Sequence, residues 1–103
     1  MPTKSNTAQN PTARITSPWR VVKVKPRAGF QLHVEFIDGT AGEVEMGRLI
    51  QGSAAGVFSS LRDTRTFMKA RVEYGAVTWP GEIDLAPDAM YDAIRANGRW
   101  VVE

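Results

Sequence analysis

Residues 71–91 read RVEYGAVTWPGEIDLAPDAMY, and this stretch decides the fold of the chain. Two short runs with β-strand character, Ala70–Tyr74 and Ala76–Trp79, are separated by a glycine. Pro80 ends the second run, because proline has no amide hydrogen to donate to a sheet. A helix is predicted to begin at Pro87, whose fixed φ suits the first helical position. The stretch therefore predicts a hairpin followed by a helix.

Upstream of this stretch, three runs of alternating apolar and polar residues predict a meander of antiparallel strands. The first run is Trp19–Lys25, in which Val22 and Val24 are predicted to point inward. Phe30–Ile37 has the clearest alternation of the three. An Asp-Gly pair, typical of a tight hairpin turn, then leads into Thr40–Met46.

The remaining segments predict one short helix and a C-terminal segment that is either a strand or part of the core packing. A short helix is expected after Asp63 or Thr64 as its N-cap, with Phe67 and Met68 buried. Residues 99–103, RWVVE, either add an edge strand or pack their tryptophan on the core. Together the patterns predict an α+β fold: a small, mostly antiparallel sheet of about five short strands, with a short helix and a C-terminal helix packed on one face.

The chain is predicted to contain one domain, preceded by a polar arm. Residues 1–17 are rich in Thr, Asn, Ser and Pro. Such a segment buries too little apolar surface to offset the entropy lost on ordering, so a disordered N-terminal arm is expected. Residues 18–103 are then expected to form a single α+β domain.

Composition excludes several classes of protein. The 103 residues include no cysteine, which excludes disulfides and Cys-ligated metal sites. No apolar run approaches the roughly 20 residues needed to span a bilayer. The N-terminus has no hydrophobic segment of the kind found in secretory signals. We therefore expect a cytoplasmic protein without a membrane association.

Positive charge is concentrated near the N-terminus. Through Arg27 there are six basic residues and no acidic ones, although the net charge of the chain is only +2. One interpretation is nucleic-acid binding, with Trp19 stacking on a base. The residues that would carry it are Arg14, Arg20, Lys23, Lys25 and Arg27. The alternative, which we favour, is a solvated strand whose charges face acidic residues on neighbouring strands.

Catalytic and metal sites are poorly supported by the sequence. His33 is the only histidine, and it shares a strand face with Glu35. A metal site would need further oxygen ligands from Glu43 or Glu45, and a solvated sheet residue is the favoured interpretation. The small-residue segment 52–56 has neither the order of a nucleophile elbow nor the lysine of a phosphate loop. No catalytic residue, metal or cofactor is therefore predicted, and no enzymatic activity.

Acidic and aromatic residues around the end of the predicted hairpin form a candidate partner-binding rim. Trp and Tyr often anchor protein interfaces. A tryptophan at the end of a strand is equally a lid for a small core, and core packing is the favoured role of Trp79. The residues of the candidate rim are Trp79, Pro80, Glu82, Asp84 and Tyr91.

A succession of short motifs links the chain to a known family. In order they are Val24-Lys25-Pro26, the run F-x-L-x-V-x-F followed by Asp38-Gly39-Thr40, Gly56-Val57-Phe58, Leu61-Arg62-Asp63, Trp79-Pro80, Asp84-Leu85, Pro87-Asp88 and Tyr91. This order resembles the small bacterial family called domain of unknown function 2442. The resemblance covers Trp19 to Ile94. The chain departs from it in its long N-terminal arm and in the residues that follow Pro80.

The resemblance implies a compact α+β domain for which no catalytic residues are established. Members occur alone, fused to a helix-turn-helix domain, or encoded beside a small protein in an arrangement like that of toxin and antitoxin. It suggests a non-enzymatic interaction module, antitoxin-like or regulatory, that binds a small protein partner. Self-association into a homodimer is a further expectation, and accessory nucleic-acid binding is the alternative function.

Overall fold

The fold is of the α+β class with mostly antiparallel strands, which confirms the prediction, and its strands are divided between two sheets. The computed structural model describes residues 17–103, so the predicted arm lies outside the described residues except for Ser17. In chain order the elements are β1 (Val21–Arg27), β2 (Gln31–Phe36), β3 (Ala41–Glu45), α1 (Gly47–Ile50), the 3-10 helix η1 (Gly56–Arg62), α2 (Thr64–Phe67), β4 (Arg71–Glu73), β5 (Ala76–Trp79), β6 (Ile83–Asp84), α3 (Pro87–Asn97) and β7 (Arg99–Val101).

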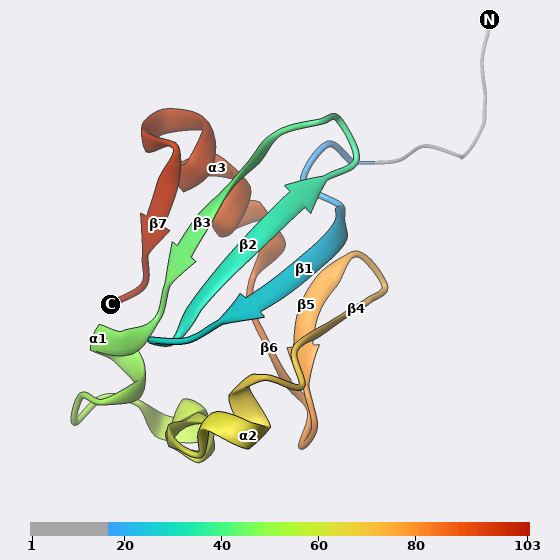
Figure 1. Ribbon diagram of the computed structural model, residues 1–103. Coiled ribbons are helices and arrows are strands. Elements are labelled where there is room, and N and C mark those ends of the chain that lie inside the picture. The colour runs from blue at the N-terminus through green and yellow to red at the C-terminus, as the bar shows by residue number, and fades with distance from the viewer. Residues whose placement is uncertain (1–16) are drawn as a thin grey trace, which may run out of the picture.

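The two sheets share one core. The larger sheet has the strand order β1-β2-β3-β7, and only its β3–β7 pair is parallel. The smaller sheet has the order β4-β5-β6 and is antiparallel throughout. Figure 1 shows α3 behind the larger sheet and the smaller sheet beside β1. One face of the larger sheet therefore covers the core, and the other faces solvent.

A β-bulge near the start of β1 determines which valine enters the core. Val21 pairs with Phe36 and Lys23 pairs with Glu35, so Val22 is an extra residue in β1. Val21 is buried, whereas Val22 is 51% exposed. The predicted inward orientation of Val22 is therefore wrong, because the bulge shifts the two-residue alternation at this point.

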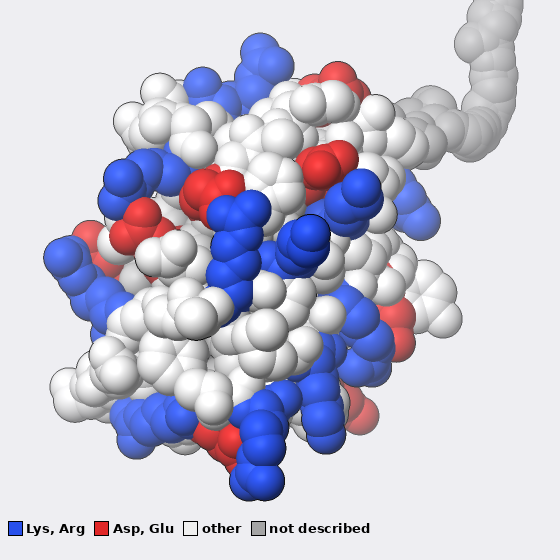
Figure 2. Space-filling view, in the orientation of Figure 1, with Lys and Arg blue, Asp and Glu red and all other residues white. Residues whose placement is uncertain are grey.

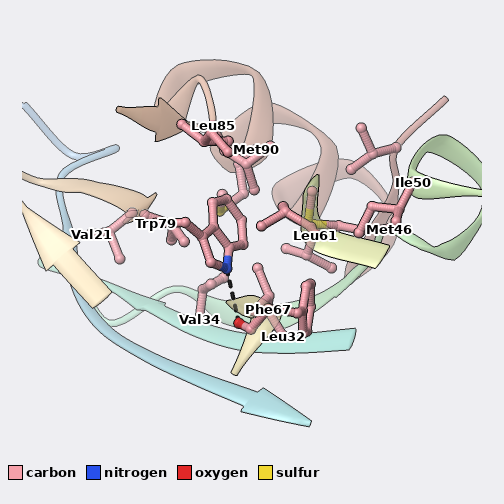
Figure 3. Close-up of a cluster of buried hydrophobic side chains, with 14 of the residues drawn as sticks. Val21, Leu32, Val34, Met46, Ile50, Leu61, Phe67, Trp79, Leu85 and Met90 are labelled. Carbon is pink, nitrogen blue, oxygen red and sulfur yellow. Dashed lines mark hydrogen bonds between the residues drawn. The ribbon is translucent and has the colours of Figure 1, made fainter. Parts of the chain in front are cut away.

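Trp79 lies at the centre of the core (Figure 3). Its side chain is completely buried, and its Nε1–H donates a hydrogen bond to the main-chain carbonyl of Phe67 at 2.9 Å. The two aromatic rings are 5.9 Å apart between centroids. The surrounding apolar side chains come from both sheets and from the helices, and include Val21, Leu32, Val34, Met46, Ile50, Leu61, Leu85 and Met90.

Helix α2 is capped as predicted, but it buries only one of the two expected side chains. The carboxylate of Asp63 accepts a hydrogen bond from the main-chain N–H of Arg65, which satisfies a free donor of the first turn. Phe67 is buried, whereas Met68 is exposed. The prediction for Met68 is wrong, because the helix ends at Phe67 and Met68 is its C-cap.

Helix α3 follows the sequence signals closely. Pro87 occupies its first turn, together with Asp88, and Gly98 ends it in the left-handed conformation with a φ of 78°. Met90 and Ile94, one turn apart, are its buried residues. Within residues 17–103 no helix has the length and apolar character required to cross a membrane.

Candidate interaction surfaces

The residues of the predicted partner-binding rim divide between the core and the surface. Trp79 has no exposed surface, so it cannot contact a partner in the folded protein, and the structure shows it in the core, which is the role the sequence favoured. Pro80, Glu82 and Asp84 are exposed around the turn between β5 and β6. Tyr91 is half-buried on α3. The part of the rim that is open to a partner consists of Pro80, Glu82 and Asp84.

Tyr91 ties α3 to the turn between β2 and β3. Its hydroxyl donates to Asp38 Oδ2 at 2.5 Å, and the same carboxylate accepts the main-chain N–H of Thr40 through Oδ1 at 2.9 Å. The hydrogen bond from Tyr91, assisted by that from Thr40, lowers the pKa of Asp38. The same contact raises the pKa of the Tyr91 phenol, because ionising it would place two anions side by side. This pair therefore has a structural role in joining two elements.

The β4–β5 hairpin presents an exposed tyrosine on a turn that disfavours it. Glu73 pairs with Ala76, so only Tyr74 and Gly75 form the turn. Their φ values of 52° and 77° are those of a type I′ turn, in which Asn, Asp and Gly are preferred. The side chain of Tyr74 is 93% exposed. Its ring therefore gains almost nothing from packing that would offset the left-handed backbone.

Three further exposed apolar side chains lie beside this turn. The carbonyl of Gly75 accepts the N–H of Val21 at 2.9 Å, and the carbonyl of Arg20 accepts the N–H of Ile37 at 2.9 Å. The turn, the start of β1 and the end of β2 are thus neighbours. Four of the six large exposed apolar side chains in residues 17–103 gather here. We call this group the hairpin-tip patch, and its members are Trp19, Val22, Ile37 and Tyr74.

The solvent face of the larger sheet carries charges that pair with one another. One row crosses all four strands and contains Lys25, His33, Glu43 and Arg99. His33 Nδ1 lies 2.7 Å from Glu43 Oε2, and its Nε2 lies 3.4 Å from Glu35 Oε2. Arg27 binds the other oxygen of Glu43 at 3.0 Å. Figure 2 accordingly shows basic and acidic side chains interspersed over this face.

The surroundings of His33 can be compared with the metal site considered for it. Between residues 17 and 103, no group of three His, Asp or Glu side chains is arranged to hold a metal ion. His33 contacts two glutamates, Glu35 and Glu43, on the solvent face of the sheet.

The basic residues considered for nucleic-acid binding are only partly available. They are Arg14, which lies outside the described residues, and Arg20, Lys23, Lys25 and Arg27. Arg27 is engaged by Glu43. Lys23 lies directly opposite Glu35 in the β1–β2 pairing. Acidic side chains on the neighbouring strands therefore lie beside the basic side chains of β1.

The sequence-based interpretation missed Tyr74 as a surface residue. It places the hairpin about Gly75 and leaves Tyr74 in the preceding strand. A type I′ turn needs two residues with positive φ, so the residue before the glycine must also lie in the turn. The signal that identifies Tyr74 as the exposed tip is that only two residues, Tyr74 and Gly75, separate the two strands.

Comparison with known proteins places the chain in a family without assigning an activity. No curated protein and no solved structure matches it. One family, described as protein of unknown function (DUF2442), has a model that matches residues 21–96. The match begins at the first residue of β1 and ends within α3, so it spans both sheets and the core that joins them. The chain therefore belongs to the DUF2442 family of proteins of unknown function.

Proposed function

We propose that this protein is a non-enzymatic module that binds a small protein partner through the hairpin-tip patch. The observation that carries the proposal is Tyr74, which is 93% exposed while its backbone holds the left-handed conformation. Backbone strain at a fully exposed aromatic residue has no benefit for folding, and such strain is often associated with function. The role that we propose for this binding is antitoxin-like or regulatory.

The composition of the patch suits a protein interface. Tyrosine and tryptophan bury large areas on binding and dominate the energetics of many interfaces. In the hairpin-tip patch Tyr74 and Trp19 supply these rings, and Val22 and Ile37 add exposed apolar surface. An exposed aromatic group of this kind on a small domain favours a binding role over a purely structural one.

The hairpin tip is also held in place before any partner arrives. The hydrogen bond from Val21 to Gly75 fixes the turn to β1. The side chain of Arg20 covers Gly75 so closely that a Cβ at this position would lie 2.7 Å from Arg20 Cγ. A preorganised loop loses less conformational entropy on binding than a mobile one. Arg20 and Lys23, both exposed beside the patch, favour a partner with acidic residues around an apolar centre.

Affinity capture from the native cell with matched variants tests the proposal. Tyr74→Asn removes the ring and suits the turn, whereas Val57→Asn removes an exposed apolar side chain from η1, outside the patch. We expect one protein to be recovered in stoichiometric amount by the parent chain and by Val57→Asn, but not by Tyr74→Asn. Recovery that is equal for all three, or no stoichiometric partner at all, would contradict the proposal.

Accessory nucleic-acid binding is the second candidate. The observation that favours it is that Lys23 and Lys25 are exposed and form no ion pair within the described part of the chain. Fluorescence anisotropy with labelled single-stranded DNA and RNA at low salt is the test. Binding that weakens steeply with salt and is lost in Lys23→Glu/Lys25→Glu would support this candidate. The absence of binding at low salt would remove it.

A further inference from the structure

Strand β7 forms an open edge of the larger sheet. It is the last strand in the order β1-β2-β3-β7, and its one strand neighbour in the described chain is β3. Figure 1 shows no helix or strand beyond it on the outer side. An open edge offers unpaired main-chain donors and acceptors to another strand, and proteins usually protect such edges.

The main-chain groups on the open side of β7 belong to alternate residues. Val102 donates its N–H to the carbonyl of Glu45 at 2.9 Å, toward β3. Because successive residues in a strand turn their N–H and C=O groups to opposite sides, Trp100 also faces β3. Arg99 and Val101 therefore direct their main-chain groups away from the sheet, and Glu103 would follow if the strand continued.

The side chains along this edge are complementary to a second copy of themselves. Arg99 and Glu103 lie at equal distances along the chain from Val101, on either side of it. We propose that two copies of the protein pair their β7 strands antiparallel about a twofold axis at Val101. Arg99 of each copy then lies opposite Glu103 of the other. Opposite charges that face each other across a strand pair are stabilising, whereas like charges there are destabilising.

This register also satisfies the hydrogen-bonding pattern of the edge. In an antiparallel pair, every second opposed residue pair exchanges both main-chain hydrogen bonds. With Val101 on the axis, these are the Val101–Val101 and Arg99–Glu103 pairs, which are the residues whose polar groups point outward. A register centred on Trp100 or Val102 fails, because their main-chain groups face β3.

The inner side of the same pairing would cover apolar surface. Trp100 of one copy lies opposite Val102 of the other, as a pair without main-chain hydrogen bonds, in which side chains approach most closely. Trp100 is half-buried and packs against the core, so it has apolar surface left to cover. The two larger sheets become one continuous sheet, and the hairpin-tip patch, on the β1 side, stays outside the contact.

Sedimentation velocity over a range of protein concentrations tests the pairing. We expect a monomer–dimer equilibrium in the parent chain and a dissociation constant raised about tenfold or more by Val101→Pro, which deletes the central donor of the edge. Proline is tolerated in an edge strand where its nitrogen faces solvent, so the monomer should keep its fold. Val101→Thr, which retains the donor, should dimerise as the parent chain does.

Charge reversal provides a second, independent readout. Arg99→Glu and Glu103→Arg each place like charges opposite one another, and each should weaken the dimer. The double variant Arg99→Glu/Glu103→Arg restores opposite charges and should recover dimerisation, whatever each reversal does to the contacts with Glu45 and Arg48 within one copy. A chain that stays monomeric at all concentrations, or a dimer that Val101→Pro leaves intact, would overturn the proposal.

Discussion

The indole nitrogen of Trp79 and the main-chain oxygen of Phe67 are 2.9 Å apart, and the hydrogen bond between them joins the smaller sheet to α2 inside the core. Neither group is accessible to water, since Trp79 has no exposed surface and Phe67 is 1% exposed. The last carbonyl of α2 thus accepts two hydrogen bonds, one from the indole and one from the main-chain N–H of Ala70 at 3.2 Å.

Trp79→Phe is expected to destabilise the protein by about 2–4 kcal/mol. The smaller ring leaves a cavity, and the carbonyl of Phe67 loses the indole donor and keeps only the N–H of Ala70. Urea unfolding followed by circular dichroism measures the change. Trp19→Phe is the matched control, because Trp19 is exposed and its replacement should change the free energy of unfolding by less than about 0.5 kcal/mol. Equal effects of the two variants would contradict the central position of Trp79.

Tyr74→Asn is expected to stabilise the fold by about 1 kcal/mol. Asparagine adopts the left-handed conformation more readily than tyrosine, and Asn-Gly is the preferred pair for this turn. The change is read from the midpoint of thermal or urea unfolding. Tyr74→Ala, which keeps the strained backbone, should give no such gain. Destabilisation by the asparagine variant would mean that the tyrosine ring contributes to packing after all.

Gly42→Ala is expected to cost about 1–3 kcal/mol, because it overpacks the contact between β3 and α3. A Cβ at Gly42 would lie 2.7 Å from the carbonyl oxygen of Gly98 and 2.7 Å from Ile94 Cγ2. Gly47→Ala is the control, since the nearest atom to its added Cβ is 3.9 Å away. Chemical denaturation should therefore show a clearly larger loss in the free energy of unfolding for Gly42→Ala than for Gly47→Ala. If Gly42→Ala leaves the free energy of unfolding unchanged, α3 can shift to make room for the added methyl group.

Acid stability should depend on Tyr91. The pKa of Asp38 is lowered from 3.8 in the folded protein, so its contribution to stability is present above that pH and is lost as the pH falls through the folded pKa. Tyr91→Phe removes the largest cause of the shift. We expect its free energy of unfolding to fall less between pH 5 and pH 2 than that of the parent chain. An NMR titration of the Asp38 carboxyl should show its pKa moving up toward 3.8 in the variant.

The sequence predicts well those features that depend on neighbouring residues. Asp63 caps α2, and Gly98 ends α3 in the left-handed conformation. The alternation in Phe30–Ile37 correctly places Leu32 and Val34 in the core. Each of these follows from side chains and backbone within one turn or one strand, where the physical rules act locally.

Features that depend on pairing between strands far apart in the chain could not be predicted from the sequence. Nothing near Val22 signals the bulge that turns it outward, because the bulge is set by the register with β2. Residues 99–103 likewise contain no signal that β7 pairs in parallel with β3. The sequence favoured core packing for Trp79, but the elements that bury its ring, α2 and both sheets, depend on the same distant contacts.

The pairing of β3 with β7 has a consequence for the order in which the protein is made. The two strands are neighbours in the sheet, yet the whole of the smaller sheet and all of the helices lie between them in the chain. As the chain leaves the ribosome, one edge of β3 stays without its partner strand until Arg99–Val101 has been synthesised. Contacts between such distant segments also slow folding. During that interval β3 is a free edge in the nascent chain, and the charged side chains of Glu43 and Glu45 help to keep it from pairing with other strands.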